Sequence, residues 1–281
     1  MRADIRYNQV IDGAEFDRAQ AAADEAPDLP GNKIDTERFY VTQHHDRYSE
    51  ENHRTWRELY QERMRTLNQQ ASRVFLDGLE KIQLTGDRVP DLSVVNGNLR
   101  RLTGWQSRPV PGYLPAKAFF ACLARRQFPT TITIRPHELK YYLPEPDIFH
   151  DVFGHVPLHA DPVFADFLQT YGEAALKVED PDDVTRLGRL FWFTVEFGLI
   201  REDNRVKLYG SGLISSIGES EFALTSPNVD RRPFDLDRVC DTPFEIDHYQ
   251  PILYVLDSFE QLRDAMHEYA SRVLRRAGVA A

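Results

Sequence analysis

Residues 142–158, with the sequence YLPEPDIFHDVFGHVPL, decide the fold. Their apolar residues predict a helix over about 147–154, and His150 and His155 lie five residues apart within or beside it. Five residues of a regular helix turn about 140° beyond one full turn, so the two imidazoles would not share a face. Gly154 lies between them, and glycine commonly ends a helix in the left-handed conformation. We therefore expect the helix to end at Gly154 and His155 to fold back toward His150.

Further along the chain, a second apolar segment supplies a carboxylate. Glu196 lies in the middle of a strongly apolar helix that we expect over 182–200. A buried, unpaired carboxylate costs several kcal/mol, so Glu196 needs a compensating cation, which an arginine or a metal ion could supply. Two histidines and one carboxylate form the ligand set of non-haem Fe(II) oxygenases, and similar ligands hold catalytic zinc. His150, His155 and Glu196 are thus candidate metal ligands.

The rest of the chain is predicted to be mostly helical with a small β component, an α+β domain. Residues 1–40 are acidic, rich in alanine and contain a cluster of helix breakers at 27–32, so we expect a flexible or loosely docked N-terminal arm. A single domain is expected over 41–281. Helices are predicted over about 49–79, 92–102, 115–123, 147–154, 162–177, 182–200 and from a capping box at Ser258 and Gln261 onward, with strands near 131–134, 206–209 and 252–255 and a loop over 108–112.

Composition excludes several classes of protein. The 281 residues are 42% hydrophobic, which is enough for a sizeable core, and the formal net charge of −10 disfavours nucleic acid and anionic membranes as partners. The longest apolar run covers residues 118–124, far short of the roughly 18 residues of a membrane span, and residues 1–7 do not resemble a secretory signal. Two cysteines, Cys122 and Cys240, are too few for a disulfide framework. We expect a cytoplasmic protein.

Three motifs together resemble the signatures of the pterin-dependent aromatic amino acid hydroxylases. They are residues 142–158, 191–199 and 209–216, and the likeness extends over about 95–265 in matching order and spacing. The resemblance implies the single catalytic domain of that family and an Fe(II) centre held by His150, His155 and Glu196. It also implies a tetrahydropterin as the two-electron reductant and O2 as co-substrate.

The same resemblance assigns roles to other residues. Phe119 matches the phenylalanine that stacks on the pterin ring, and Leu114 and Asp151 match further pterin contacts, although many relatives carry glutamate in place of Asp151. Arg135 matches the arginine that binds the amino acid carboxylate, and Asp147 matches the aspartate that holds its guanidinium, which can bind carboxylates bidentately. The positions that match the lining of the substrate pocket are Trp192, Phe197, Gly212 and Ser215.

The predicted reaction is hydroxylation of free L-phenylalanine to L-tyrosine. Trp192 stands where tryptophan hydroxylases of the family tend to have phenylalanine, and Ile246 stands where tyrosine hydroxylases carry an acidic residue. Leu143 and Phe191 replace residues that often bear a hydroxyl in animal relatives, so we expect any hydrogen bond made there to be missing. Hydroxylation of phenylalanine at the meta position is known in the bacterial branch and stays open, as does another aromatic amino acid substrate.

Two other classes of function stay open at this point. A zinc-dependent hydrolase could use the same three ligands, with Glu145 or Asp151 as general base. A non-catalytic sensor would bind a pterin or an amino acid without consuming oxygen. Animal members of the family carry an additional regulatory domain and an assembly helix, for which this chain leaves no length, so we expect a monomer.

Overall fold

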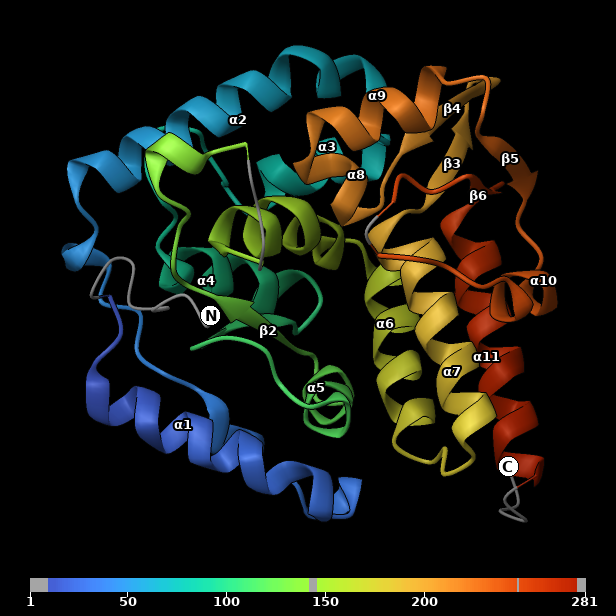
Figure 1. Cartoon of the computed structure of the whole chain (residues 1–281), viewed down its shortest axis with the longest axis horizontal. Helices are drawn as coiled ribbons and strands as arrows, with labels where there is room; N and C mark the ends of the chain where they lie inside the picture. Colours follow the sequence, from blue (N-terminus) through green and yellow to red (C-terminus); the bar gives the residue numbers. More distant parts are fainter. Residues whose placement is uncertain (1–9, 142–145, 247, 277–281) are drawn as a thin grey trace.

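The structure, a computed structural model, describes residues 10–141, 146–246 and 248–276. It consists mostly of helices, together with two small sheets (Figure 1). The predicted α+β class is therefore confirmed. The α-helices are α1 Gly13–Glu25, α2 Glu50–Gln70, α3 Arg73–Lys81, α4 Leu92–Leu102, α5 Ala116–Leu123, α6 Pro162–Ala175, α7 Pro181–Phe191, α8 Ser211–Ser215, α9 Ile217–Thr225, α10 Leu236–Asp241 and α11 Phe259–Arg276. The strands are β1 Gln106–Val110, β2 Gln127–Thr131, β3 Leu199–Glu202, β4 Arg205–Leu208, β5 Asp230–Pro233 and β6 Ile252–Leu256. Two π-helical segments, Phe149–His155 and Trp192–Glu196, carry the predicted metal ligands.

The two sheets are separate. β1 and β2 pair in parallel, whereas the larger sheet has the order β4-β3-β6-β5, with β3 antiparallel to β4 and parallel to β6. The strand expected over 131–134 is wrong in position, because β1 ends at Val110 opposite Thr131 and does not pair with the residues that follow. The carbonyls beyond the ladder find other partners: that of Ile132 accepts from Tyr48 Oη at 2.5 Å, and that of Thr133 from the amide of Ile148 at 2.8 Å.

Helices α6, α7 and α11 lie side by side (Figure 1), and their apolar side chains are buried in the main core. α6 begins as its sequence dictates: the Asp161 side chain accepts from the amides of Val163 and Phe164 at 3.0 and 2.9 Å, with proline at the first helical position. In α11, Ser258 caps the amide of Gln261 at 3.2 Å, as expected. The return contact of that capping box reaches the amide of Asp257, not that of Ser258.

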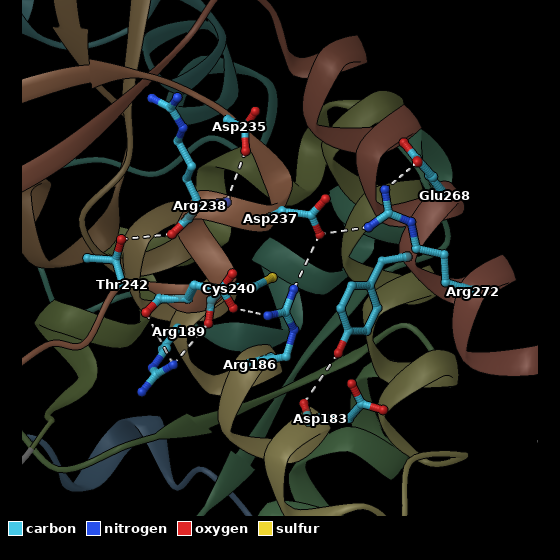
Figure 2. A network of polar contacts seen from close by, with 12 residues as sticks. Asp183, Arg186, Arg189, Asp235, Asp237, Arg238, Cys240, Thr242, Glu268 and Arg272 are labelled. Carbon is cyan, nitrogen blue, oxygen red and sulfur yellow. Dashed lines mark hydrogen bonds and ion pairs between the residues drawn. The ribbon is translucent and has the colours of Figure 1, made fainter. Parts of the chain in front are cut away.

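A network of charged side chains fastens α10 between α7 and α11 (Figure 2). Arg186 of α7 contacts Asp237 and Asp241, and Arg272 of α11 contacts Asp237 at 2.7 Å and Glu268 at 2.6 Å. The carboxylates are more than half exposed, so each pair contributes little to the free energy of unfolding. The network therefore orients α10, while burial of apolar side chains beneath it provides most of the stability.

The long helix expected over 49–79 is two helices, α2 and α3. The break falls at Ala71 and Ser72, where Ala71 forms a bridge with Leu208 of β4 and the amide of Ser72 donates to the Leu208 carbonyl at 2.8 Å. The Ser72 hydroxyl then caps α3 by accepting from the amide of Phe75 at 3.2 Å. The amphipathic spacing continues across the break, so only the contact with a distant strand reveals it.

The described part of the N-terminal arm, residues 10–40, packs against the rest of the chain. The C-terminal part of α1 and the turns after it form a small apolar cluster with Val110 and α5, whereas Ala19 of α1 belongs to the main core. Tyr40 Oη donates to Gln127 Oε1 at 2.8 Å and so joins this cluster to β2. Both cysteines are buried free thiols, and burial raises the pKa of Cys240 to about 12. Within the described residues, no helix is both long and apolar enough to span a membrane.

His159 is a polar residue in an apolar place. Its side chain is 0% exposed between Trp105, Phe128 and Phe164, and neither ring nitrogen has a hydrogen-bond partner in the part of the chain that the structure describes. Burial holds the pKa of His159 well below its ordinary value. An unpaired buried polar group costs about 1–3 kcal/mol, so this residue lowers the stability of the fold.

We expect His159→Phe to raise the free energy of unfolding by about 1–3 kcal/mol, because phenylalanine fills the site without unpaired nitrogens. Since the unfolded histidine titrates near 6.5 and the folded one lower, acid favours the unfolded wild-type chain, and the gain should widen below about pH 6.5. Calorimetric unfolding of both proteins in the same metal state between pH 5 and 8 measures this. A less stable variant with unchanged metal content would contradict it.

Candidate active site

The three predicted metal ligands converge. His150 Nε2 lies 3.3 Å from His155 Nε2 and 3.7 Å from Glu196 Oε2, and His155 Nε2 lies 3.3 Å from Glu196 Oε1. One ligand atom from each side chain falls within 4.8 Å of the others, and no second group of this kind exists among the described residues. Nitrogen and carboxylate donors this close, without an arginine between them, match the chemistry of a divalent metal site.

The helix that carries the two histidines does not end at Gly154, so the expected explanation of their approach is wrong. Residues Phe149–His155 form a π-helix, whose hydrogen bonds join residues five apart and thereby bring His150 and His155 to one side. Gly154 does not adopt a positive φ. A Cβ there would lie 3.1 Å from Ser211, so the glycine instead allows α8 to approach closely.

Glu196 does not lie in the centre of a helix, which corrects the second expectation. α7 ends at Phe191, the π-helix Trp192–Glu196 follows, and β3 begins at Leu199. Glu196 is therefore the last residue of a π-helix, and its side chain is 17% exposed. A π-helical turn thus presents each part of the ligand set, and such turns often occur at functional sites.

Two serines of α8 hold the ligands. Ser215 Oγ donates to the Ser211 carbonyl at 2.8 Å, so it accepts from His150 Nδ1 at 2.9 Å. That contact places the proton of His150 on Nδ1 and leaves the lone pair of Nε2 for a metal. Ser211 Oγ donates to Glu196 Oε2 at 2.7 Å. Ser215, expected only to line the substrate pocket, therefore also orients a ligand.

Charge states at the site suit metal binding. Burial lowers the pKa of His150 to about 4, although the nearby Glu196 carboxylate opposes that effect. Burial alone would raise the pKa of Glu196, but the charge and hydrogen bond of His155, with the Ser211 hydroxyl, hold it at about 2. A neutral His150 and an ionised Glu196 are the forms in which these side chains coordinate metals.

Arg135 and Asp147 form a buried bidentate pair beside the metal ligands. Arg135 Nε and Nη2 donate to the two oxygens of Asp147, each at 2.7 Å, with both side chains at most 8% exposed. Burial alone would raise the pKa of Asp147, but the charge of Arg135 lowers it. Asp147 Oδ1 also accepts from the amide of His150 at 3.0 Å. One carboxylate therefore holds both the arginine and the backbone of one predicted metal ligand, His150.

The residues expected to contact a pterin lie in different surroundings. Phe119 is half-buried, edge-to-face with Phe128 at 6.1 Å, and Phe128 packs on the His155 ring at 4.7 Å. Asp151 Oδ2 accepts from the amide and hydroxyl of Thr131, each at 2.7 Å, and burial raises the pKa of Asp151 to about 6. Leu114 packs beside the arm's cluster. Leu143 and Glu145, the latter the other candidate base of a hydrolase, lie outside the described residues.

The predicted substrate pocket has an aromatic wall. Trp192 packs on Phe197 with ring centroids 4.6 Å apart and stacks on Phe244 at 4.4 Å and 12°. A Cβ on Gly212 would lie 3.0 Å from the ring of Phe197, so this glycine leaves room for that ring. The rings of Phe197 and Phe244 thus pack on Trp192, and Gly212 lies close to Phe197 and to the Glu196 carbonyl. Ile246 is 77% exposed on the segment that carries Phe244.

With this geometry established, comparison with known proteins decides the family. The pattern described as "Biopterin-dependent aromatic amino acid hydroxylase" matches residues 42–280 of this chain. The chain belongs to that family. Among characterised relatives, phenylalanine-4-hydroxylase of Chromobacterium violaceum is 46% identical over 84% of this chain and 79% of its own. That of Mesorhizobium japonicum is 42% identical over 85% and 87%.

Solved structures agree with the family. Phenylalanine hydroxylase from C. violaceum with bound oxidised Fe(III) superposes with a TM-score of 0.81 at 42% identity, covering 91% of this chain and 92% of that one. The same enzyme bound to cobalt gives a TM-score of 0.80 at 44% identity, over 85% and 87% of the two chains. The single catalytic domain expected for this aromatic amino acid hydroxylase is therefore confirmed.

Sequence reasoning missed three residues of the hydroxylase's site. Ser211 lies within the motif 209–216, but nothing local shows that its hydroxyl reaches Glu196. Thr131, the partner of Asp151, shows only the alternation of a strand in the sequence. No sequence pattern points to Phe244, because it lies 52 residues after Trp192 in the sequence and reaches the aromatic wall only through the fold.

Gly210 offers a test of the site's packing. A Cβ there would lie 2.4 Å from both the Glu196 carbonyl and the amide of Gly198, so Gly210→Ala must displace the backbone of a ligand. We expect a loss of about 1–3 kcal/mol of stability together with weaker metal retention. Thermal unfolding and metal analysis measure both. Gly188→Ala in α7, where a Cβ meets nothing within 4 Å, is the matched control and should be neutral or stabilising.

Proposed function

We propose that this chain is a phenylalanine 4-monooxygenase that converts free L-phenylalanine to L-tyrosine with Fe(II), a tetrahydropterin and O2. The observation that carries the proposal is the convergence of His150, His155 and Glu196 beside the buried Arg135–Asp147 pair. The three convergent side chains suit a metal that activates oxygen, and the guanidinium of the Arg135–Asp147 pair suits the carboxylate of an amino acid. The named relatives at 42–46% identity carry this activity in their names.

In this proposal His150, His155 and Glu196 hold the iron, leaving positions open for O2 and substrate. The donor set fits: the Nε2 lone pair of His150 is free because its Nδ1 proton is engaged by Ser215. Bound iron and pterin would supply the electrons and the activation of oxygen, which no side chain provides. Residues 41–281 are the proposed catalytic domain.

The protein's own residues bind and orient the reactants. Arg135, oriented by Asp147, receives the amino acid carboxylate, and the wall of Trp192 and Phe197 beside Gly212 receives the aromatic ring. Ser215 keeps the tautomer of His150 at the edge of this pocket. Phe119, Leu114 and Asp151 are the proposed pterin contacts, with Phe119 offering a ring face and Asp151 a carboxylate. Aromatic side chains around the site exclude water from the reaction.

The decisive experiment incubates the protein with Fe(II), a reduced pterin, O2 and each aromatic amino acid in turn. Products are separated against para- and meta-tyrosine standards. para-Tyrosine formed from phenylalanine, in amounts that match the pterin oxidised, is the expected result. meta-Tyrosine would correct the position of attack. Iron-loaded protein that yields no hydroxylated product, or protein that zinc alone makes active, would contradict the proposal.

We also propose that the enzyme is a monomer and acts in the cytoplasm. The two cysteines, both buried as free thiols, suit a reducing compartment. Light scattering during size-exclusion chromatography should give the mass of one chain, 32.5 kDa. A mass near four times that value would contradict a monomer.

A further inference from the structure

Residues 136–141, which we name the clamp loop, run from Arg135 across the surface of α2. Three of their side chains contact two glutamates of that helix. Lys140 Nζ donates to Glu58 Oε2 at 2.6 Å and to Glu62 Oε1 at 3.1 Å. His137 Nε2 lies 3.0 Å from Glu58 Oε2, and Tyr141 Oη donates to Glu62 Oε1 at 3.1 Å. The clamp loop is thus fastened to α2 at both ends.

Lys140 is the centre of these contacts. Glu58 and Glu62 are four residues apart on α2, so their charges lie on one face and repel each other unless a cation stands between them. The Lys140 side chain is only 14% exposed, whereas the glutamates are 35% and 21% exposed. Hydrogen bonds from Lys140 and His137 lower the pKa of Glu58 to about 2, so the carboxylate is ionised at every physiological pH. A half-buried ammonium with two carboxylate partners is more rigid than a single surface pair.

The backbone of Lys140 reaches the proposed substrate site. Its carbonyl accepts from Arg135 Nη1 at 3.1 Å, while Asp147 accepts from Nε and Nη2. The Arg135 guanidinium is therefore held at two edges, one by a carboxylate and the other by the clamp loop. A guanidinium has five N–H donors, so further donors stay free for a substrate carboxylate in an orientation that both contacts define.

We propose that Lys140 is a positioning residue for substrate binding: by tying the clamp loop to Glu58 and Glu62, it fixes the guanidinium of Arg135 for the carboxylate of the amino acid. The inference rests on the proposed function, in which Arg135 binds that carboxylate. Lys140 contacts Glu58, Glu62 and Arg135, so its effect is expected on amino acid binding and not on iron or on the chemical step.

The test compares Lys140→Met, which keeps the length of the side chain without its charge, with Lys140→Arg, which keeps the charge. Lys207→Met is the matched control, because Lys207 also donates to α2, at the Gln69 carbonyl, but from β4. In the iron-loaded enzyme we expect Lys140→Met to raise KM for phenylalanine about tenfold, the effect of one weakened hydrogen bond to a charged group, with kcat within about twofold. Lys140→Arg should restore most of the affinity, and Lys207→Met should resemble the wild type.

Iron content and thermal unfolding are measured on the same samples. If Lys140→Met does not fold, Glu62→Gln, which removes the negative charge of one partner of Lys140, should still raise KM with iron retained. Unchanged KM in Lys140→Met, a fall confined to kcat, or equal defects in the methionine and arginine variants would each overturn the proposal. If the wild type hydroxylates no aromatic amino acid, the proposed function fails by itself. Hydrogen exchange over 135–141 then tests the clamp: faster exchange in Lys140→Met supports it, and unchanged exchange overturns it.

Discussion

Replacing His150 or Glu196 with alanine should abolish both iron retention and hydroxylation while the chain stays folded. Each variant removes one of the three side chains whose ligand atoms, among the described residues, lie within 4.8 Å of one another. Loss of an outer partner of a metal ligand typically weakens metal binding by 10–100-fold, so loss of a ligand itself should weaken it by more than about 100-fold. Metal analysis after dialysis, together with phenylalanine turnover at saturating Fe(II), measures the two losses.

A histidine outside the site provides the control. His267 lies on α11, half exposed, with Nε2 2.9 Å from Asp166 Oδ2. His267→Ala should retain iron and activity like the wild type. Ser215→Ala should have an intermediate effect, because it removes only the acceptor of His150 Nδ1. Full iron content and turnover in His150→Ala would show that the convergent side chains are not the metal ligands.

Arg135→Lys is expected to raise KM for phenylalanine about 100-fold with iron still bound. A lysine ammonium cannot reproduce the planar fork that donates to both oxygens of Asp147 at 2.7 Å and still face a second carboxylate. Hydrogen bonds to charged groups contribute about 1.5–3 kcal/mol each, and the loss of one or two of them corresponds to this change in affinity. Steady-state kinetics at saturating pterin, with iron analysis alongside, measure the effect.

Arg186→Lys is the matched control, since Arg186 is also held by two aspartates but in the surface network between α7 and α10 (Figure 2). Its kinetic constants should equal those of the wild type. Loss of iron in Arg135→Lys, or an unchanged KM, would mean that the arginine has a structural role or another ligand. Asp147→Asn should weaken both substrate binding and iron retention, because Asp147 also accepts from the amide of His150.

Local sequence patterns predicted the bounds of helices and strands well where contacts between nearby residues determine those bounds. The helix expected over 92–102 is α4, Leu92–Leu102, and the strand expected near 252–255 is β6. They failed where a distant segment decides the outcome. The amphipathic spacing of 49–79 continues through Ala71, yet β4 takes the next amide and splits the helix. The alternation at 131–134 suits a strand, yet β1 ends too early to pair with it.

The candidate site shows the same division. Residue types and motif spacing identified His150, His155 and Glu196, and the structure brings them together. The means of their approach differs from the expectation: the helix does not end at Gly154 and Glu196 is not inside a regular helix, because two π-helical turns occur there. Nor could the serines of α8 be assigned, since hydrogen bonds across 65 positions to His150 and 15 to Glu196 leave no local periodicity.

By itself, the sequence determined the family, the class of reaction and the candidate metal ligands, because side-chain chemistry and motif order are properties of the chain alone. Only the tertiary structure decided how those side chains meet and which neighbours hold them. The π-helical turns, the Ser211 and Ser215 contacts and the attachment of Lys140 to α2 all depend on where distant backbone and side-chain donors find acceptors. A buried donor must be satisfied by whatever lies beside it in space, and sequence distance does not measure that.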